Sequence, residues 1–354
     1  MRDDVRFMVR VPACVVAALA LLSALLPHAA GAQSAVESFY KGRTIDLQIG
    51  FSVGGTYDLY GRLVARFIGR HIPGQPTIIP KQMVGAGTRL VATYIYAIAP
   101  KDGTQLGVAD QALPLQQAMG EPGIQLDARR LSWIGNPIAD NNTMVAWHTA
   151  GIAKIEDAKS RTFTVGANGI TAAAQYAQAM NTLIGTKFSI ITGYPGGTEI
   201  NLAMERGEVA IRGQNSWSSW KANHREWLDQ KKIVVLVQMG LEKTPELADV
   251  PLLMDLAPTP EGREVLRLLS APTAIGRPIF TTPDTPPDRL AALRAAFDAT
   301  MRDPAFIADA QRLGLDLNPV GGVALQRIVG EIVEAPASVT TRLAGILAEL
   351  HKSR

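Results

Sequence analysis

Short apolar runs alternate with amphipathic segments along most of the chain, a pattern typical of strands alternating with helices. The clearest unit covers residues 45–70. Residues 45–49 predict a buried strand, residues 52–55 a glycine turn, and the apolar positions from Leu59 to Ile68 one face of a helix. Similar units follow it. Strand–loop–helix units in series favour a parallel sheet with right-handed crossovers.

This alternation is interrupted twice. Residues 133–147 form an extended stretch that is polar in its middle, and residues 271–287 carry five prolines. We interpret both stretches as crossings between two lobes. The prediction is an α/β protein with lobe 1 built from residues 33–140 and 272–354 and lobe 2 from residues 141–271. Each lobe would be a mainly parallel sheet flanked by helices, with the strand ends facing an interdomain cleft.

Residues 1–32 have the three parts of a signal peptide: a basic start, an apolar run over residues 11–26 and an A-x-A site at residues 30–32. We expect cleavage after Ala32 and a soluble periplasmic protein. Cys14, the only cysteine, lies in this segment, so the mature chain has no disulfide and no thiolate site.

The charge of the mature chain excludes some partners. Cleavage removes three arginines and two aspartates from totals of 35 Lys+Arg and 32 Asp+Glu, which leaves a nearly neutral chain. Without a basic run or patch, nucleic acid is not expected as a partner.

One motif points to an enzyme. Residues 50–54 fit G-x-S-x-G, with Ser52 in the position of a nucleophile between a strand and a helix. A secreted serine hydrolase is therefore the alternative function. Against it, the motif lies in the first strand of the mature chain, and none of its four histidines follows a recognisable late strand. We expect no enzymatic activity and no catalytic residue.

No cofactor or metal is expected either. The glycine motif at residues 85–87 lacks the third glycine of a dinucleotide fingerprint, because Leu90 stands there. His148 and His224 have no partner at the spacing of a metal ligand.

Four loops have the chemistry of an anion site, namely residues 52–57, 84–88, 167–171 and 194–198. Each follows a predicted strand and opens a helix, so each can present backbone N–H groups to an oxygen; the alternative is a plain turn. Asp110 and Asn215 lie at equivalent strand ends. The predicted ligand-binding residues are Ser52, Gly54, Gly55, Thr56, Tyr57, Asp58, Gly85, Ala86, Gly87, Asp110, Asn168, Gly169, Thr171, Tyr194, Gly196, Gly197, Thr198 and Asn215.

Two charged residues allow two interpretations. Asp58 lies in the first turn of its predicted helix, where it either contacts a ligand or only caps the helix. Arg212 ends a predicted strand and either pairs with a carboxylate or makes a surface ion pair.

Six short segments carry a family resemblance. Residues 50–58 (GFSVGGTYD) are similar to a first loop P-F-P-P-G-G-G-T-D, and residues 82–88 (QMVGAGT) to N-x-P-G-A-G-G. The others are APKDGT at 99–104, YPGG at 194–197, LADVP at 247–251 and the D-P…L-G segment at 303–314. In this order they resemble the extracytoplasmic solute-binding proteins of tripartite tricarboxylate transporters.

The resemblance implies a two-lobed periplasmic-binding-protein (Venus-flytrap) fold that binds a small carboxylate, such as a di- or tricarboxylate or a related organic acid. It implies a carrier that delivers this ligand to one large and one small membrane subunit, and we expect a monomer. Ser52 and Val53 replace two prolines of the first loop, which leaves the identity of the ligand open. A sensor that presents the bound ligand to a receptor is a further alternative.

Overall fold

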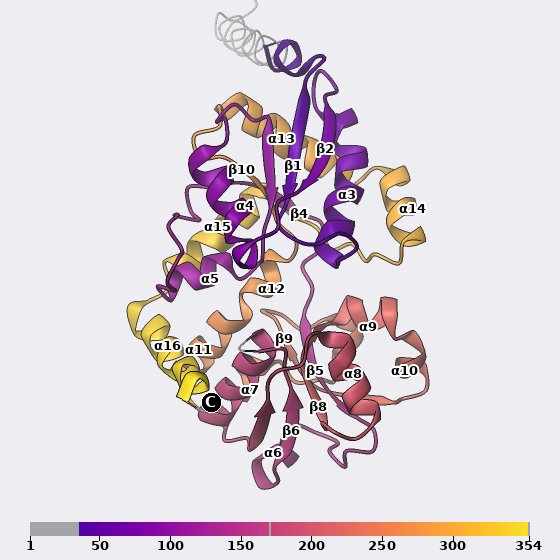
Figure 1. Ribbon diagram of the computed structural model, residues 1–354, viewed down its shortest axis with the longest axis vertical. Coiled ribbons are helices and arrows are strands. Elements are labelled where there is room, and N and C mark those ends of the chain that lie inside the picture. Colours follow the sequence, from indigo (N-terminus) through magenta and orange to yellow (C-terminus); the bar gives the residue numbers. More distant parts are fainter. Residues whose placement is uncertain (1–34, 170, 353–354) are drawn as a thin grey trace, which may run out of the picture.

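Two lobes, each a mixed sheet flanked by helices, form the molecule, and one lies above the other in Figure 1. The computed structural model describes residues 35–169 and 171–352, so the predicted signal peptide and its cleavage site lie outside the described residues. Within these residues no helix combines the length and apolarity needed to span a membrane. The predicted two-lobed α/β fold is confirmed.

The upper sheet in Figure 1 has the strand order β11-β4-β10-β3-β1-β2. Strand β1 pairs in parallel with β2 and β3, whereas β10 is antiparallel to β3 and β4, and β11 is antiparallel to β4. The strands are β1 (Thr44–Ile49), β2 (Thr77–Gln82), β3 (Gln105–Val108), β4 (Ser132–Asn136), β10 (Ile279–Thr281) and β11 (Val320–Gly321).

Helix α3 and helix α13 pack together on one face of this sheet. The apolar positions of α3 recur at helical spacing, so Leu63 and Phe67 join Phe297 of α13 in a common core, while Leu59 is left 37% exposed. The helices and short turns of this part are α3 (Thr56–Ile68), η1 (Gly69–His71), η2 (Ala86–Thr88), α4 (Arg89–Thr93), η3 (Tyr94–Ile98), α5 (Leu113–Ala118), α13 (Pro287–Thr300), α14 (Pro304–Arg312) and α15 (Gly322–Val333).

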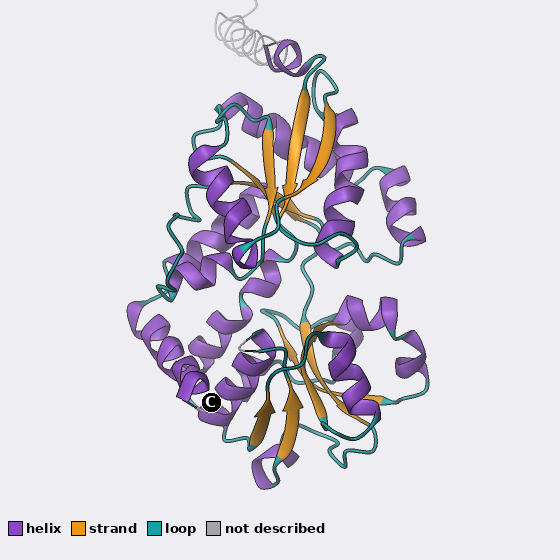
Figure 2. Ribbon diagram, viewed as in Figure 1, coloured by secondary structure: helices purple, strands orange, loops and turns teal. Residues whose placement is uncertain are grey.

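The lower sheet (Figure 2) has the order β7-β6-β8-β5-β9, in which β6, β7 and β8 are parallel and β5 is antiparallel to β8 and β9. Its strands are β5 (Asn142–Trp147), β6 (Phe163–Gly166), β7 (Phe188–Ile191), β8 (Ile211–Ser216) and β9 (Ile233–Met239). The helices and turns around it are α6 (Asp157–Ser160), α7 (Ala172–Ile184), α8 (Gly197–Glu205), α9 (Trp217–Asn223), α10 (Arg225–Asp229), η4 (Pro245–Leu247), η5 (Leu253–Leu256) and α11 (Pro260–Ser270).

Several element boundaries differ from the sequence prediction. Strand β8 runs to Ser216, so Asn215 lies inside a strand rather than after it. The second crossing begins with a short helix, α12 (Pro272–Ile275), because proline suits the first position of a helix. Helix α16 (Ala337–Lys352), which falls within the predicted lobe 1, packs against α7 and α11 of the other lobe through Leu343 and neighbouring apolar residues. The lobe boundaries themselves stay a prediction.

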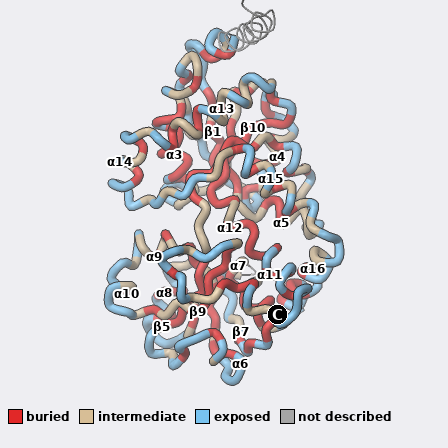
Figure 3. The backbone as a smooth tube through the Cα atoms, turned by 180° about the vertical axis from the view of Figure 1, so that it is seen from behind, coloured by how far each residue is buried: buried red, intermediate tan, exposed pale blue. Residues whose placement is uncertain are grey.

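The two crossings are fixed to each other. Residues 137–141 join β4 to β5, and residues 276–278 join α12 to β10. The buried Asn136 holds both, since its Oδ1 accepts hydrogen bonds from Ile138 N at 3.0 Å and from Arg277 N at 2.9 Å. Gly276 has a φ of +62°, and a Cβ there would collide with the carbonyl oxygen of Ile138. Figure 3 shows that the chain is largely buried where α12 lies between the lobes.

Gly276→Ala is therefore expected to destabilise the protein by about 2–4 kcal/mol, through a strained φ and a backbone collision. Gly330→Ala is the matched control, because a Cβ at that helical position meets nothing within 4 Å. It should stabilise by up to about 1 kcal/mol. Urea unfolding measures both, and equal midpoints for the two variants would contradict this account of the crossing.

Candidate ligand-binding site

The predicted residues form two sets, one at an end of each sheet. In Figure 1 these two sheet ends face each other. The first set follows the parallel strands β1, β2 and β3, and the second follows β6 and β7 or lies in β8. The first set is Ser52, Gly54, Gly55, Thr56, Tyr57, Asp58, Gly85, Ala86, Gly87 and Asp110; the second is Asn168, Gly169, Thr171, Tyr194, Gly196, Gly197, Thr198 and Asn215.

Side-chain contacts join the three segments of the first set. The ring of Tyr57 stacks on Phe51 with centroids 3.9 Å apart, and its hydroxyl accepts from Gln111 N at 3.3 Å. The hydroxyl of Thr88, in the second loop, accepts from Asp110 N at 3.0 Å. The sequence therefore identified positions that are neighbours in the fold.

Asp58 holds the first loop in shape. Its side chain is 1% exposed, and its carboxylate accepts from Gly54 N at 2.9 Å, from Arg62 Nε at 2.8 Å and from the side-chain amide of Gln82. Three donors already satisfy this carboxylate, so it ties the glycine turn to α3 and β2. Of the two interpretations of Asp58, the geometry favours a structural one.

The second loop has an unusual backbone. Ala86, Gly87 and Thr88 all have positive φ values, of 48°, 61° and 69°. For alanine and threonine this conformation costs on the order of 1–3 kcal/mol each, and it persists only where the surroundings impose it. The buried Thr88, bonded to Asp110 N, is one such restraint.

In the second set, the loop after β7 opens helix α8. The first helical bond runs from Ile200 N to Gly196 O, and no side chain caps this end. Within the described residues, the N–H groups of residues 197–199 therefore have no acceptor. Together with the helix dipole they favour an anion at this position.

Arg212 lies directly beneath this helix end. Its guanidinium donates to Asn201 Oδ1 at 2.7 Å, to Asn215 Oδ1 at 3.1 Å and to the carbonyl of Gln214. All of these acceptors are neutral, and no acidic residue forms an ion pair with Arg212 in the part of the chain that the structure describes. Burial lowers the pKa of Arg212 to about 10, which leaves it protonated at neutral pH.

The position of Arg212 explains why residue 197 is a glycine. A Cβ at Gly197 would collide with the guanidinium of Arg212, so the glycine allows the positive group to approach the helix N-terminus. Asn215, which orients the same guanidinium, has a buried Nδ2 without a partner. The sequence singled out these three residues separately but not their contact.

Asn201 connects His224 to Arg212, because it forms a hydrogen bond with each of them. The side-chain amide of Asn201 donates to His224 Nε2 at 2.8 Å while its oxygen accepts from Arg212. This arrangement requires an unprotonated Nε2. Burial lowers the pKa of His224 below its usual value, and the nearby positive charge of Arg212 acts in the same direction.

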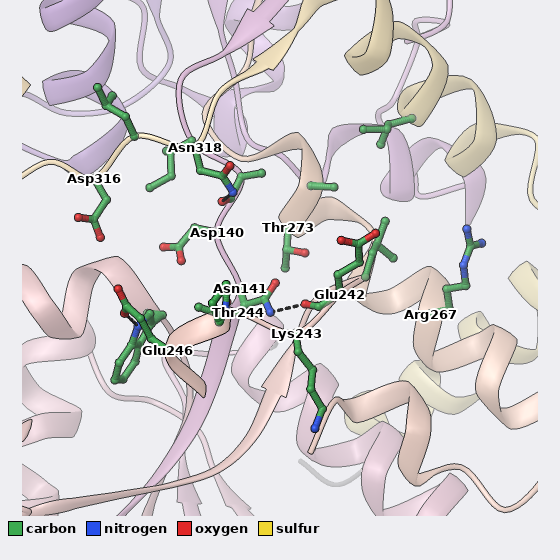
Figure 4. A pocket seen from close by; sticks show the side chains of 18 of the residues that line it. Asp140, Asn141, Glu242, Lys243, Thr244, Glu246, Arg267, Thr273, Asp316 and Asn318 are labelled. Atoms are coloured by element: carbon green, nitrogen blue, oxygen red, sulfur yellow. Dashed lines mark hydrogen bonds between the residues drawn. The ribbon is translucent and has the colours of Figure 1, made fainter. Parts of the chain in front are cut away.

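A separate cavity of about 810 Å³ opens beside the first crossing (Figure 4), and none of the predicted ligand-binding residues lines it. Lys221 of α9 contributes to its wall and pairs with Glu246 at 2.9 Å and Asp316 at 2.8 Å. Because Asp316 precedes β11 of the upper sheet, this ion pair links the two lobes. In residues 35–169 and 171–352, no hydrogen bond joins the two sets of predicted residues, and no group of three potential ligands could hold a metal.

Comparison with known proteins places the fold in a class. No family model and no curated protein match the sequence. The fold is that of two-lobed periplasmic binding proteins. A TctC solute-binding protein from Polaromonas, solved without ligand, has a TM-score of 0.66 and 18% identity over 88% of this chain and 99% of that one.

Two other solved neighbours contain ligands. Rpa4515 from R. palustris, with adipate, has a TM-score of 0.61 and 17% identity over 86% of this chain and 98% of its own. MatC from Rhodopseudomonas palustris, with bound malate, has a TM-score of 0.58 and 19% identity over 86% and 99%. At these identities the likeness establishes the fold, and the resemblance drawn from the sequence motifs is confirmed at that level.

The lowered pKa of His224 predicts an acid-sensitive stability. A proton binds this residue more weakly in the folded protein than in the unfolded chain, so stability should fall as pH drops through the unfolded pKa of about 6.5. His224→Gln keeps an acceptor for Asn201 without titrating. Between about pH 7.5 and pH 5 the wild type should lose more unfolding free energy than this variant. Equal losses in urea titrations would show that His224 does not stay neutral.

Proposed function

We propose that this protein is an exported solute-binding protein that captures a small carboxylate between its two lobes for a tripartite tricarboxylate transporter. The observation that carries the proposal is Arg212, a partly buried cation with neutral partners only, beside the open N-terminus of α8. A desolvated charge without a counter-ion is costly, and a ligand carboxylate would supply the counter-ion.

The proposed capture uses both lobes. A carboxylate at Arg212 would accept charge-assisted hydrogen bonds from the guanidinium and from the free N–H groups of residues 197–199. The loops of the first set, with exposed Ser52 and Gly55, would then approach the same ligand as the lobes close around the crossings. The ligands of the structural neighbours, adipate and malate, belong to the same chemical class.

The hydrolase alternative finds no support in the geometry. Ser52 lies in an exposed loop, and its side chain is hydrogen-bonded to no histidine in the described chain. A nucleophilic serine needs a base within hydrogen-bonding reach. Fluorophosphonate labelling of Ser52 would nevertheless reopen this alternative.

Export is the first testable part of the proposal. We expect a mature chain beginning at Gln33 in the periplasm, because the A-x-A site precedes that residue. Intact-mass measurement of a periplasmic extract checks this. A mass that still includes residues 1–32, or recovery from membranes alone, would contradict it.

Binding is the second part, tested by thermal shift with succinate, malate, adipate and citrate. A ligand at about 100 times its Kd should stabilise the wild type by roughly 2.7 kcal/mol, at roughly 2–4 °C per kcal/mol. Arg212→Gln should abolish most of this shift, because it removes the cation of the site. Arg206→Gln is the control: the same change on an exposed arginine of the same lobe, which should keep the shift.

Two results would count against the function. If none of the four acids shifts the wild type, the protein is not a receptor for this class of ligand. If Arg212→Gln responds as the wild type does, the carboxylate is not bound at α8.

A further inference from the structure

A second arginine occupies the corresponding end of the other sheet. Arg277 lies in the second crossing, between α12 and β10, and is 8% exposed. Its backbone is fixed, since its N–H donates to Asn136 and the preceding Gly276 fits tightly against Ile138. Because β10 is antiparallel to β3, Arg277 stands beside the end of β3, next to Asp110.

The guanidinium of Arg277 has no hydrogen-bond or ion-pair partner among residues 35–169 and 171–352. Its Nε is fully enclosed and unpartnered. The two terminal nitrogens also make no hydrogen bond within the described residues, and neither is among the fully enclosed, unpartnered side-chain atoms. Buried arginines are normally paired, and an unpaired one costs several kcal/mol of free energy.

The surroundings direct this group toward the candidate site. Its central carbon lies over the Tyr57 ring, 5.3 Å from the ring centre, and the same ring stacks on Phe51. Tyr57 belongs to the first predicted loop, and its hydroxyl accepts a hydrogen bond from Gln111 N. Arg277 therefore lies against the first set of predicted residues. A planar guanidinium on an aromatic face keeps its edge free for a carboxylate.

Two acidic residues lie near Arg277, and neither forms an ion pair with it. Asp140 is occupied by the N–H and hydroxyl of Ser218, and Asp110 accepts from Ala112 N. Burial raises the pKa of both carboxyl groups, although Arg277 partly offsets the effect. Each of these carboxyl groups therefore keeps its proton to a higher pH than an exposed aspartate does.

We propose that Arg277 binds a second carboxylate of the ligand, so that one arginine in each lobe selects dicarboxylates over monocarboxylates. This inference rests on the proposed function and adds the substrate class. A ligand with a carboxylate at each end would neutralise Arg212 in one lobe and Arg277 in the other, and would join the lobes. A monocarboxylate could satisfy only one of them.

Calorimetry on the mature protein tests this with matched probes: succinate, glutarate and adipate, each beside its monoamide. The wild type should prefer the diacid to the monoamide. Arg277→Gln should weaken binding of the diacid by about 10- to 100-fold, the equivalent of one charged hydrogen bond of roughly 1.5–3 kcal/mol. It should also bring the diacid-to-monoamide ratio toward one, because the glutamine no longer discriminates between carboxylate and amide.

Two further variants control for structure. Arg302→Gln removes the same charge from an exposed position near the end of α13 and should leave both affinities unchanged. Arg277→Lys keeps the charge but loses the planar fork, so it should retain the preference for the diacid at lower affinity. This variant also carries the test if Arg277→Gln does not fold.

The outcomes separate the inference from the function on which it rests. If the wild type binds diacids and Arg277→Gln either binds them equally well or weakens diacid and monoamide by the same factor, the inference is overturned and the proposed function stands. Wild-type affinity in Arg277→Lys overturns the inference as well. If the wild type binds none of the six probes, the proposed function fails and the inference fails with it.

Discussion

A guanidinium withdrawn from water without an ion-pair partner is unfavourable, and Arg212 and Arg277 are two such groups in the described chain. Among the described residues, Arg212 in β8 has only neutral acceptors, and the guanidinium of Arg277, two residues before β10, has none. Other arginines, such as Arg62 and Arg66, pair with aspartates in the usual way. In our proposal, the carboxylates of a ligand supply the missing ion-pair partners and so recover this free-energy cost.

The connection between the lobes determines whether such a ligand can be shared. Asn136 holds the two crossings together, and the ion pair of Lys221 with Asp316 links the lobes beside the cavity of Figure 4. In the described residues, no direct hydrogen bond joins the end of one sheet to the facing end of the other. A ligand bound at both ends would replace missing contacts between the lobes, which is how a small molecule can bias a hinge.

Periodicity predicted most of the fold, and the turn chemistry placed four loops at the carboxyl ends of parallel strands. Local patterns missed what depends on contacts distant in sequence. Nothing in the sequence around Asp58 shows that Gln82 and Arg62 donate hydrogen bonds to its carboxylate. The need for a glycine at position 197 is likewise apparent only in the structure, where the Arg212 guanidinium lies against it. Arg277 escapes such local patterns because it stands in a proline-rich crossing; the available signal is a single charge in an otherwise uncharged stretch, residues 271–282.

The most direct measurement is a crystal structure of the mature protein with a dicarboxylate that binds it. Our account predicts one carboxylate within about 2.7–3.2 Å of the Arg212 guanidinium or the N–H groups that open α8, and the other at the same range from Arg277. A ligand seated instead in the cavity that Lys221 and Asp316 help to line, with both arginines untouched, would contradict it.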